Sequence, residues 1–178
     1  MKIAVFHGWG STSKDNWFPW LKNELEKKGH EVFCPDLPDT EFPDQDKWLK
    51  KAMEFKYDEN TILVGHSSGS VLILHLLMRF KVKAAYLVSA FLTTLGIDDI
   101  KALFKTEFDY EKIKSNAEKI VIMNSDDDPY IPLENVQDLQ KKLDSSMIIF
   151  EKMEHLSAGT DNFKFPELLS LIENENSN

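Results

Sequence analysis

Six short runs of apolar residues, rich in valine and isoleucine, are spaced along the chain. They occupy residues 3–7, 31–34, 61–65, 84–88, 119–124 and 147–150. Most of them do not alternate with polar residues, which is typical of parallel strands that are covered on both faces. We expect each run to form a buried strand of one parallel sheet.

Segments with a helical spacing of apolar residues lie between these runs. The predicted helices cover 17–28, 67–80, 133–143 and 165–173, and one more takes its apolar face from Trp48, Ala52, Met53 and Phe55. The helix at 67–80 is almost wholly apolar between its ends, which predicts a buried central position. The alternation of strands and helices indicates an α/β fold. We expect three layers, with about six mainly parallel strands and helices on both faces.

Residues 90–116 interrupt this alternation with a long connection after the fourth predicted strand. Its apolar residues are Phe91, Leu92, Leu95, Ile97, Ile100, Leu103, Phe104 and Phe108. Connections of this length in compact domains are usually functional. Two interpretations stay open: one or two helices that complete the core, or a small lid with an apolar lining. In the second, Phe91, Leu95 and Phe104 line a substrate pocket together with Trp9.

Length, charge and cysteine content narrow the classes of protein. The 178 residues suit one domain spanning 1–178, and a net charge of −9 disfavours nucleic acid and anionic membranes as partners. Cys34 is the only cysteine, and no stretch approaches the roughly 20 apolar residues of a membrane span. We therefore expect a cytoplasmic protein, a monomer or weak homodimer, that acts on a small molecule.

Candidate chemistry follows the predicted strands, because ligands of open parallel sheets bind beyond the carboxyl ends of the strands. After the third strand comes "GHSSG", residues 65–69, at the point where the buried helix is expected to begin. A Gly-x-Ser-x-Gly turn between strand and helix holds its serine in a strained conformation with the hydroxyl exposed. Gly65 and Gly69 would let strand and helix approach closely. Ser67 is therefore the candidate nucleophile.

A serine nucleophile needs a base, and the usual base is histidine. Of the five histidines, His155 follows the last predicted strand at the same edge of the sheet as Ser67. His30 lies at the other edge, His75 is two turns along the helix, and His66 is directed elsewhere by the turn. His155 is therefore the candidate base.

The third member of such a site is an acid that orients the histidine. Asp126, Asp127 and Asp128 all follow the fifth predicted strand, and prolines at 129 and 132 restrict the loop after Asp128. We favour Asp128, with the other two left open, and we expect at least one of the three to cap the next helix. The order Ser67, Asp128, His155 is the nucleophile, acid, base order of α/β-hydrolases. The oxyanion would be bound by the amides of Ser68 and of Trp9 in the first loop, "HGWGS".

The motifs "FHGWGS", "VGHSSGS" and "SDDDPYIP" with the terminal histidine resemble those of small serine hydrolases of the retinoblastoma-binding protein 9 type. Bacterial members of that family are often called predicted esterases. The resemblance spans the chain and implies a reduced α/β-hydrolase fold with a triad at Ser67, Asp128 and His155. Relatives commonly carry glycine where this chain has Glu154, whose role stays open. The partner motif Leu-x-Cys-x-Glu is absent around Cys34, so that binding function is not expected.

These observations predict a serine hydrolase that cleaves a small or medium acyl ester and needs no metal or organic cofactor. Two alternatives remain. One is a binding module that keeps the hydrolase scaffold without turnover, since fold does not guarantee activity. The other is an acyltransferase or peptidase that uses the same residues.

Overall fold

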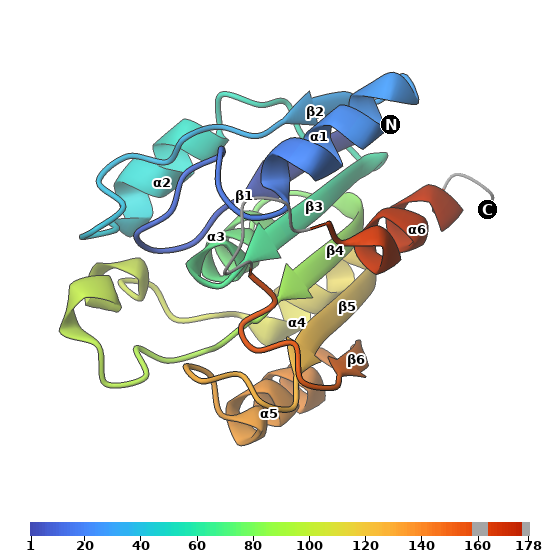
Figure 1. Ribbon diagram of the computed structural model, residues 1–178. Helices are drawn as coiled ribbons and strands as arrows, with labels where there is room; N and C mark the ends of the chain where they lie inside the picture. The colour runs from blue at the N-terminus through green and yellow to red at the C-terminus, as the bar shows by residue number, and fades with distance from the viewer. Residues whose placement is uncertain (158–163, 176–178) are drawn as a thin grey trace.

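The computed structural model describes residues 1–157 and 164–175 and shows one twisted parallel sheet between two layers of helices (Figure 1). The sheet has six strands in the order β2-β1-β3-β4-β5-β6, and every neighbouring pair is parallel. The strands are β1 (Lys2–Phe6), β2 (Glu31–Phe33), β3 (Thr61–His66), β4 (Val82–Val88), β5 (Ala117–Ser125) and β6 (Ser146–Phe150). Each strand overlaps an apolar run, so the predicted sheet is confirmed.

The helices divide between the two faces of the sheet. One face carries α1 (Phe18–Lys27) and α6 (Pro166–Asn174), which pack with Ile3, Val5 and Tyr86 in one core cluster. The other face carries α2 (Gln45–Ala52), α3 (Ser68–Leu77), α4 (Tyr110–Ser115) and α5 (Leu133–Leu143). Every residue of α3 is buried, which agrees with its continuous apolar sequence.

Two of the four residues expected on the apolar face of the second helix, Trp48 and Ala52, lie in it and are buried, and the other two do not. Observed α2 begins at Gln45 because the side chain of Asp44 caps it, accepting hydrogen bonds from the amides of Asp46 and Lys47. The helix ends at Ala52, so Met53 and Phe55 follow it instead of forming its apolar face. Met53 is exposed, and Phe55 stacks on Phe33 at the sheet edge.

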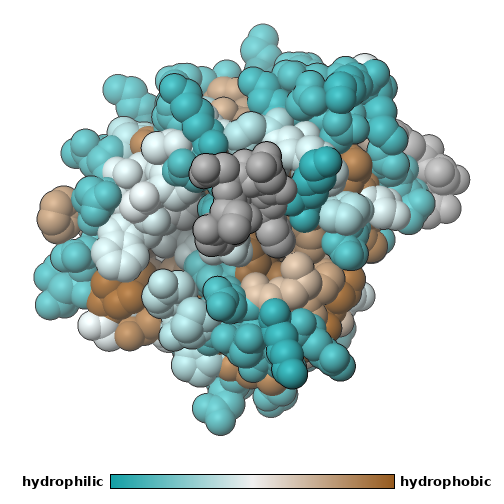
Figure 2. Space-filling model, in the orientation of Figure 1, coloured by the Kyte–Doolittle hydropathy of each residue, from teal (hydrophilic) through white to brown (hydrophobic). Residues whose placement is uncertain are grey.

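The connection between β4 and α4 holds a 3-10 helix, η1 (Asp98–Leu103), whose Ile100 and Leu103 are buried in the core of the α3 face. The same segment leaves half-buried hydrophobic side chains, and hydrophobic surface gathers over it in Figure 2. Lys105 forms ion pairs with Asp44 and Asp46 on the neighbouring helix α2. The segment thus contributes to the core and to the surface at once, and its action as a lid stays a prediction.

Strand β1 has β2 on one side and β3 on the other, so the chain leaves β1 and β3 in opposite directions. A crevice opens at the carboxyl ends of strands at such a switch point, and ligands bind there. The loops after β1 and β3 both begin at this point. Among the residues that the structure describes, no helix is long and apolar enough to span a bilayer.

Candidate active site

Ser67 lies at the junction of β3 and α3 in a strained backbone conformation. Its φ of 54° and ψ of −123° fall in a region of backbone conformation that residues other than glycine rarely adopt. The amide of Ser67 donates to the carbonyl of Val88 on β4, at 2.8 Å, and the carbonyl of Ser67 accepts from the Ser70 amide. These bonds hold the turn that presents the hydroxyl to the cavity described below.

The glycines on both sides of Ser67 are required by close packing. A Cβ added at Gly65 would lie 2.6 Å from the carbonyl oxygen of Gly69, and one added at Gly69 would lie 2.3 Å from the carbonyl oxygen of Phe6. Real Cβ atoms do not come so close to backbone. A larger residue at position 65 would therefore separate β3 from α3, and one at position 69 would separate α3 from the end of β1. The predicted close approach of strand and helix is confirmed at Gly65, whereas glycine at position 69 is required by the neighbouring strand β1.

His155 and Asp128 are brought together from loops 27 positions apart in the sequence. The Nδ1 of His155 lies 2.9 and 3.1 Å from the two carboxylate oxygens of Asp128. Burial opposes ionisation of Asp128, but the hydrogen bond and charge of His155, with the amides of Tyr130 and Ile131, hold the pKa of this carboxyl below its usual value. The carboxylate can therefore orient the imidazole and stabilise its charged form.

The other two acids of this loop hold the backbone of the histidine loop. Asp126 accepts a hydrogen bond from the Lys152 amide and Asp127 accepts one from the Glu154 amide, both at 2.8 Å. The expectation that one of the three acids caps the next helix was wrong, since Pro132 occupies the N-cap position of α5 and no side chain caps the helix. Their carboxylates find donors in the neighbouring loop instead, because residues 152–156 run beside them.

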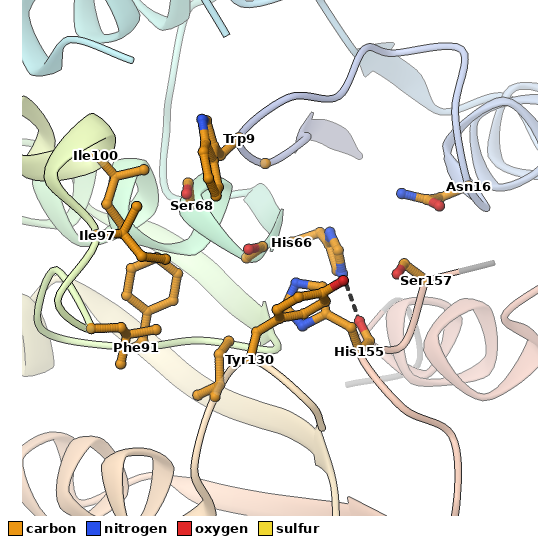
Figure 3. Close-up of a pocket in the computed structure, with 14 residues that line it drawn as sticks. Trp9, Asn16, His66, Ser68, Phe91, Ile97, Ile100, Tyr130, His155 and Ser157 are labelled. Atoms are coloured by element: carbon orange, nitrogen blue, oxygen red, sulfur yellow. Dashed lines mark hydrogen bonds between the residues drawn. The ribbon is translucent and has the colours of Figure 1, made fainter. Parts of the chain in front are cut away.

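Ser67 and His155 line one cavity of about 320 Å³ at the carboxyl ends of the strands. Its walls are Gly8, Trp9, Asn16, His66, Ser67, Ser68, Phe91, Leu95, Ile97, Ile100, Tyr130, Ile131, His155 and Ser157. In Figure 3 the hydrophobic residues Phe91, Ile97 and Ile100 stand on one side, and Asn16 and Ser157 stand on the other. In the described part of the chain Ser67 makes no hydrogen bond to His155; such bonds often tighten only when a substrate is bound.

Three of the four predicted pocket residues, Trp9, Phe91 and Leu95, line this cavity. The fourth, Phe104, does not, and its expected place in the lining was wrong. Its ring packs behind Phe91, with 6.2 Å between the ring centres, and on Phe108. Phe104 directly follows η1, and the core of the α3 face takes up its side chain.

The two candidate oxyanion donors lie in the lining of the same cavity. Ser68 is the first residue of α3, so its amide has no acceptor within the helix. The loop that carries Trp9 runs directly against the nucleophile: a Cβ built on Gly8 would lie 2.9 Å from the Cβ of Ser67. The arrangement suits stabilisation of negative charge on an atom bound to Ser67.

His7 fixes this first loop, a role that the sequence did not indicate. Its Nε2 accepts from the Leu37 amide at 2.9 Å, so its Nδ1 carries the proton and donates to the carbonyl of Gly8 at 3.0 Å. Burial lowers the pKa of His7, which keeps the ring neutral in this tautomer. The bond orients the peptide that joins Gly8 to Trp9 and with it the Trp9 amide.

The serine hydrolase family matches residues 3–174 of the chain. The chain belongs to this family. Serine hydrolase RBBP9 of Rattus norvegicus is 30% identical over 175 residues, which cover 96% of this chain and 92% of the rat protein. The putative hydrolase YdeN of Bacillus subtilis is 29% identical over 153 residues, covering 82% of this chain and 80% of YdeN.

Solved structures agree with this assignment. The crystal structure of the ydeN gene product matches with a TM-score of 0.90 at 26% identity, covering 99% of both chains. A mouse α/β-hydrolase domain-containing protein matches with a TM-score of 0.69 at 14% identity, covering 99% of this chain and 89% of the mouse chain, a likeness of fold alone. The predicted α/β-hydrolase fold and the resemblance to the retinoblastoma-binding protein 9 type are confirmed.

Tyr130, Asn16 and Ser157 of this serine hydrolase also line the cavity, although none of them was a candidate site residue. The ring of Tyr130 stands edge-on to that of His155, with 5.0 Å between the ring centres, and its residue is largely exposed. Asn16 and Ser157 supply polar groups opposite the hydrophobic wall (Figure 3). The only available signal was adjacency, since Tyr130 and Ser157 each stand two residues from Asp128 and His155. Across residues 1–157 and 164–175, no group of three acidic, histidine or cysteine side chains could hold a metal.

Proposed function

We propose that this serine hydrolase cleaves esters of small or medium acyl groups through an acyl-enzyme on Ser67. One observation carries the proposal: a serine on a strained strand-to-helix turn shares a cavity with a histidine whose Nδ1 is hydrogen-bonded to a buried carboxylate. Nucleophile, base and orienting acid in this arrangement are the components of serine-based acyl transfer.

In the proposed reaction the Oγ of Ser67 attacks the ester carbonyl carbon, and its proton passes to the Nε2 of His155. Asp128 stabilises the resulting imidazolium. The amides of Trp9 and Ser68 donate hydrogen bonds to the carbonyl oxygen, which becomes an oxyanion. Collapse of this intermediate breaks the ester C–O bond, and the leaving alkoxide takes the proton from His155. Water activated by His155 then releases the acid and restores Ser67.

The preference for a modest apolar acyl group rests on the cavity. A volume of about 320 Å³ suits a small ligand, and Phe91, Leu95, Ile97 and Ile100 supply a hydrophobic wall. The first loop brings Gly8 against Ser67, which supports an oxyanion position beside that wall.

The test combines covalent labelling with turnover. A fluorophosphonate should label the wild type at Ser67, and p-nitrophenyl esters from acetate to octanoate should be hydrolysed at rates that depend on chain length. Ser67→Ala should abolish both, whereas Ser115→Ala, at an exposed serine at the end of α4, should leave both unchanged. Labelling without ester turnover would favour another acyl substrate. A wild type that is neither labelled nor active would refute the proposal in favour of a binding module.

A further inference from the structure

The loop that carries His155 has an unusual backbone. Lys152, Glu154 and Leu156 all have positive φ values, of 54°, 49° and 48°. A positive φ strains the backbone of any residue other than glycine, so this conformation persists only where surrounding contacts impose it. The position of the base is therefore set by what holds this loop.

Side chains from other loops hold the two ends of the segment. Its amides donate to Asp126, Ser125 and Asp127, as the acidic loop runs beside it. On the carbonyl side, the indole nitrogen of Trp17 donates to the oxygen of Leu156 at 2.9 Å. The carbonyl of His155 itself receives two donors.

These two donors are His66 and Ser89. The Nε2 of His66 lies 2.9 Å from the His155 carbonyl oxygen (Figure 3), and the Oγ of Ser89 lies 3.0 Å from the same oxygen. His66 ends β3 and Ser89 follows β4, and these strands are paired, with His66 opposite Val88. Both donors thus lie at the carboxyl ends of adjacent central strands of the sheet.

We propose that His66 is a positioning residue that sets the distance between nucleophile and base. His66 precedes Ser67 in the chain, and its imidazole donates to the His155 carbonyl. The backbone of Ser67 is therefore linked to that of His155 through the single residue His66 and one hydrogen bond. Ser89 supports the same carbonyl from the next strand. The inference rests on the proposed function, because it concerns the base that accepts the proton of Ser67.

The surroundings of His66 suit a permanent neutral donor. The residue is almost fully buried, with the rings of Trp17 and Phe18 edge-on at centre distances of 6.0 and 6.1 Å. Burial, aided by the nearby His155, lowers the pKa of His66 to about 3. The neutral ring donates from Nε2 and puts no competing positive charge beside the imidazolium that forms on His155, whose ring centre is 4.8 Å away.

The experiment compares His66→Leu, His66→Gln and Ser89→Ala in turnover of a p-nitrophenyl ester and in the rate of fluorophosphonate labelling. Leucine fills space without a donor, whereas the amide of glutamine can reach the same carbonyl. Tyr57→Phe is the control, because it removes a different side-chain donor to a backbone carbonyl: the half-buried Tyr57 hydroxyl donates to the Ala52 carbonyl at 2.7 Å, near the opposite end of β3. Thermal unfolding of each variant separates positioning from a general loss of structure.

We expect His66→Leu to lower kcat and the labelling rate by about tenfold or more, with KM changed less than about twofold, because a misplaced base slows chemistry and leaves binding intact. His66→Gln should recover most of the loss, Ser89→Ala should cost about threefold, and Tyr57→Phe should match the wild type. Ser89→Ala removes one oxygen only, so it keeps the test decisive if the leucine variant does not fold.

Two results would overturn the inference while the proposed function stands: an active wild type with folded His66→Leu and Ser89→Ala variants of equal kcat, or glutamine no better than leucine. A loss confined to KM would also contradict positioning, since it would mean that His66 acts on substrate binding. Absence of labelling and turnover in the wild type would instead refute the proposed function, and the inference with it.

Discussion

Replacing His66 by glutamine should change how the stability of the protein depends on pH. The pKa of His66 is lowered from its ordinary value of 6.5 to about 3 by burial in the folded state. Below pH 6.5 the unfolded chain takes up a proton at this residue that the folded chain refuses. The stabilisation is therefore complete above pH 6.5 and is lost as the pH falls toward 3.

The loss of stability depends on how far the pH falls below 6.5, the pKa of histidine in the unfolded chain. Each pH unit between the two pKa values costs about 1.4 kcal/mol, so a fall to about pH 4.5 should cost about 3 kcal/mol through His66 alone. Burial also lowers the pKa values of His7 and His75, but both residues are present in wild type and variant, so their contributions cancel in the comparison.

Urea unfolding followed by tryptophan fluorescence measures this directly, because the buried Trp17 packs against His66. Between about pH 7.5 and about pH 4.5 the free energy of unfolding of the wild type should fall by about 3 kcal/mol more than that of His66→Gln. His30→Gln, at a half-buried histidine, is the control and should change the slope less. Parallel pH profiles for wild type and His66→Gln would refute the reasoning.

Three further predictions concern the candidate site. Gly8→Ala should slow fluorophosphonate labelling by about tenfold or more, because the new methyl would lie 2.9 Å from the Cβ of Ser67 and 3.1 Å from the His66 carbonyl oxygen. An unchanged labelling rate would mean that the loop shifts to accept the methyl without displacing Ser67. Asp128→Asn should lower kcat by about 10³-fold or more with KM retained, because an amide favours the wrong tautomer of His155, while Asp126→Asn should cost less than about tenfold; steady-state kinetics of the two variants decide, and equal losses would contradict the assignment. Phe91→Ala should shift ester preference toward longer acyl chains and destabilise the fold by about 3 kcal/mol, since Phe91 is 2% exposed; an unchanged chain-length profile would exclude Phe91 from the acyl wall.

Local features of the sequence were enough to predict the architecture and most of the candidate site. The spacing of apolar residues in a strand or helix shows whether one or both of its faces are buried, and this spacing can be read directly from the sequence. The steric demand at Gly65 is equally local, because its close neighbour is the Gly69 carbonyl in the same five-residue turn, whereas the demand at Gly69 comes from Phe6 on β1. Boundaries were less certain: Met53 and Phe55 were assigned to the apolar face of a helix that ends at Ala52.

Only the tertiary structure decided how distant loops divide their tasks. Three consecutive aspartates look alike in sequence, yet Asp128 contacts the His155 ring while Asp126 and Asp127 hold backbone amides of the same loop. Phe104 and Phe91 are equally apolar, but only Phe91 reaches the cavity. The sequence marks His66 only as a neighbour of the nucleophile, yet its ring donates a hydrogen bond to the carbonyl of His155, 89 positions away. Such hydrogen bonds depend on which loops the strand order of the sheet brings together. No pattern of residues along the chain indicates which distant loops become neighbours.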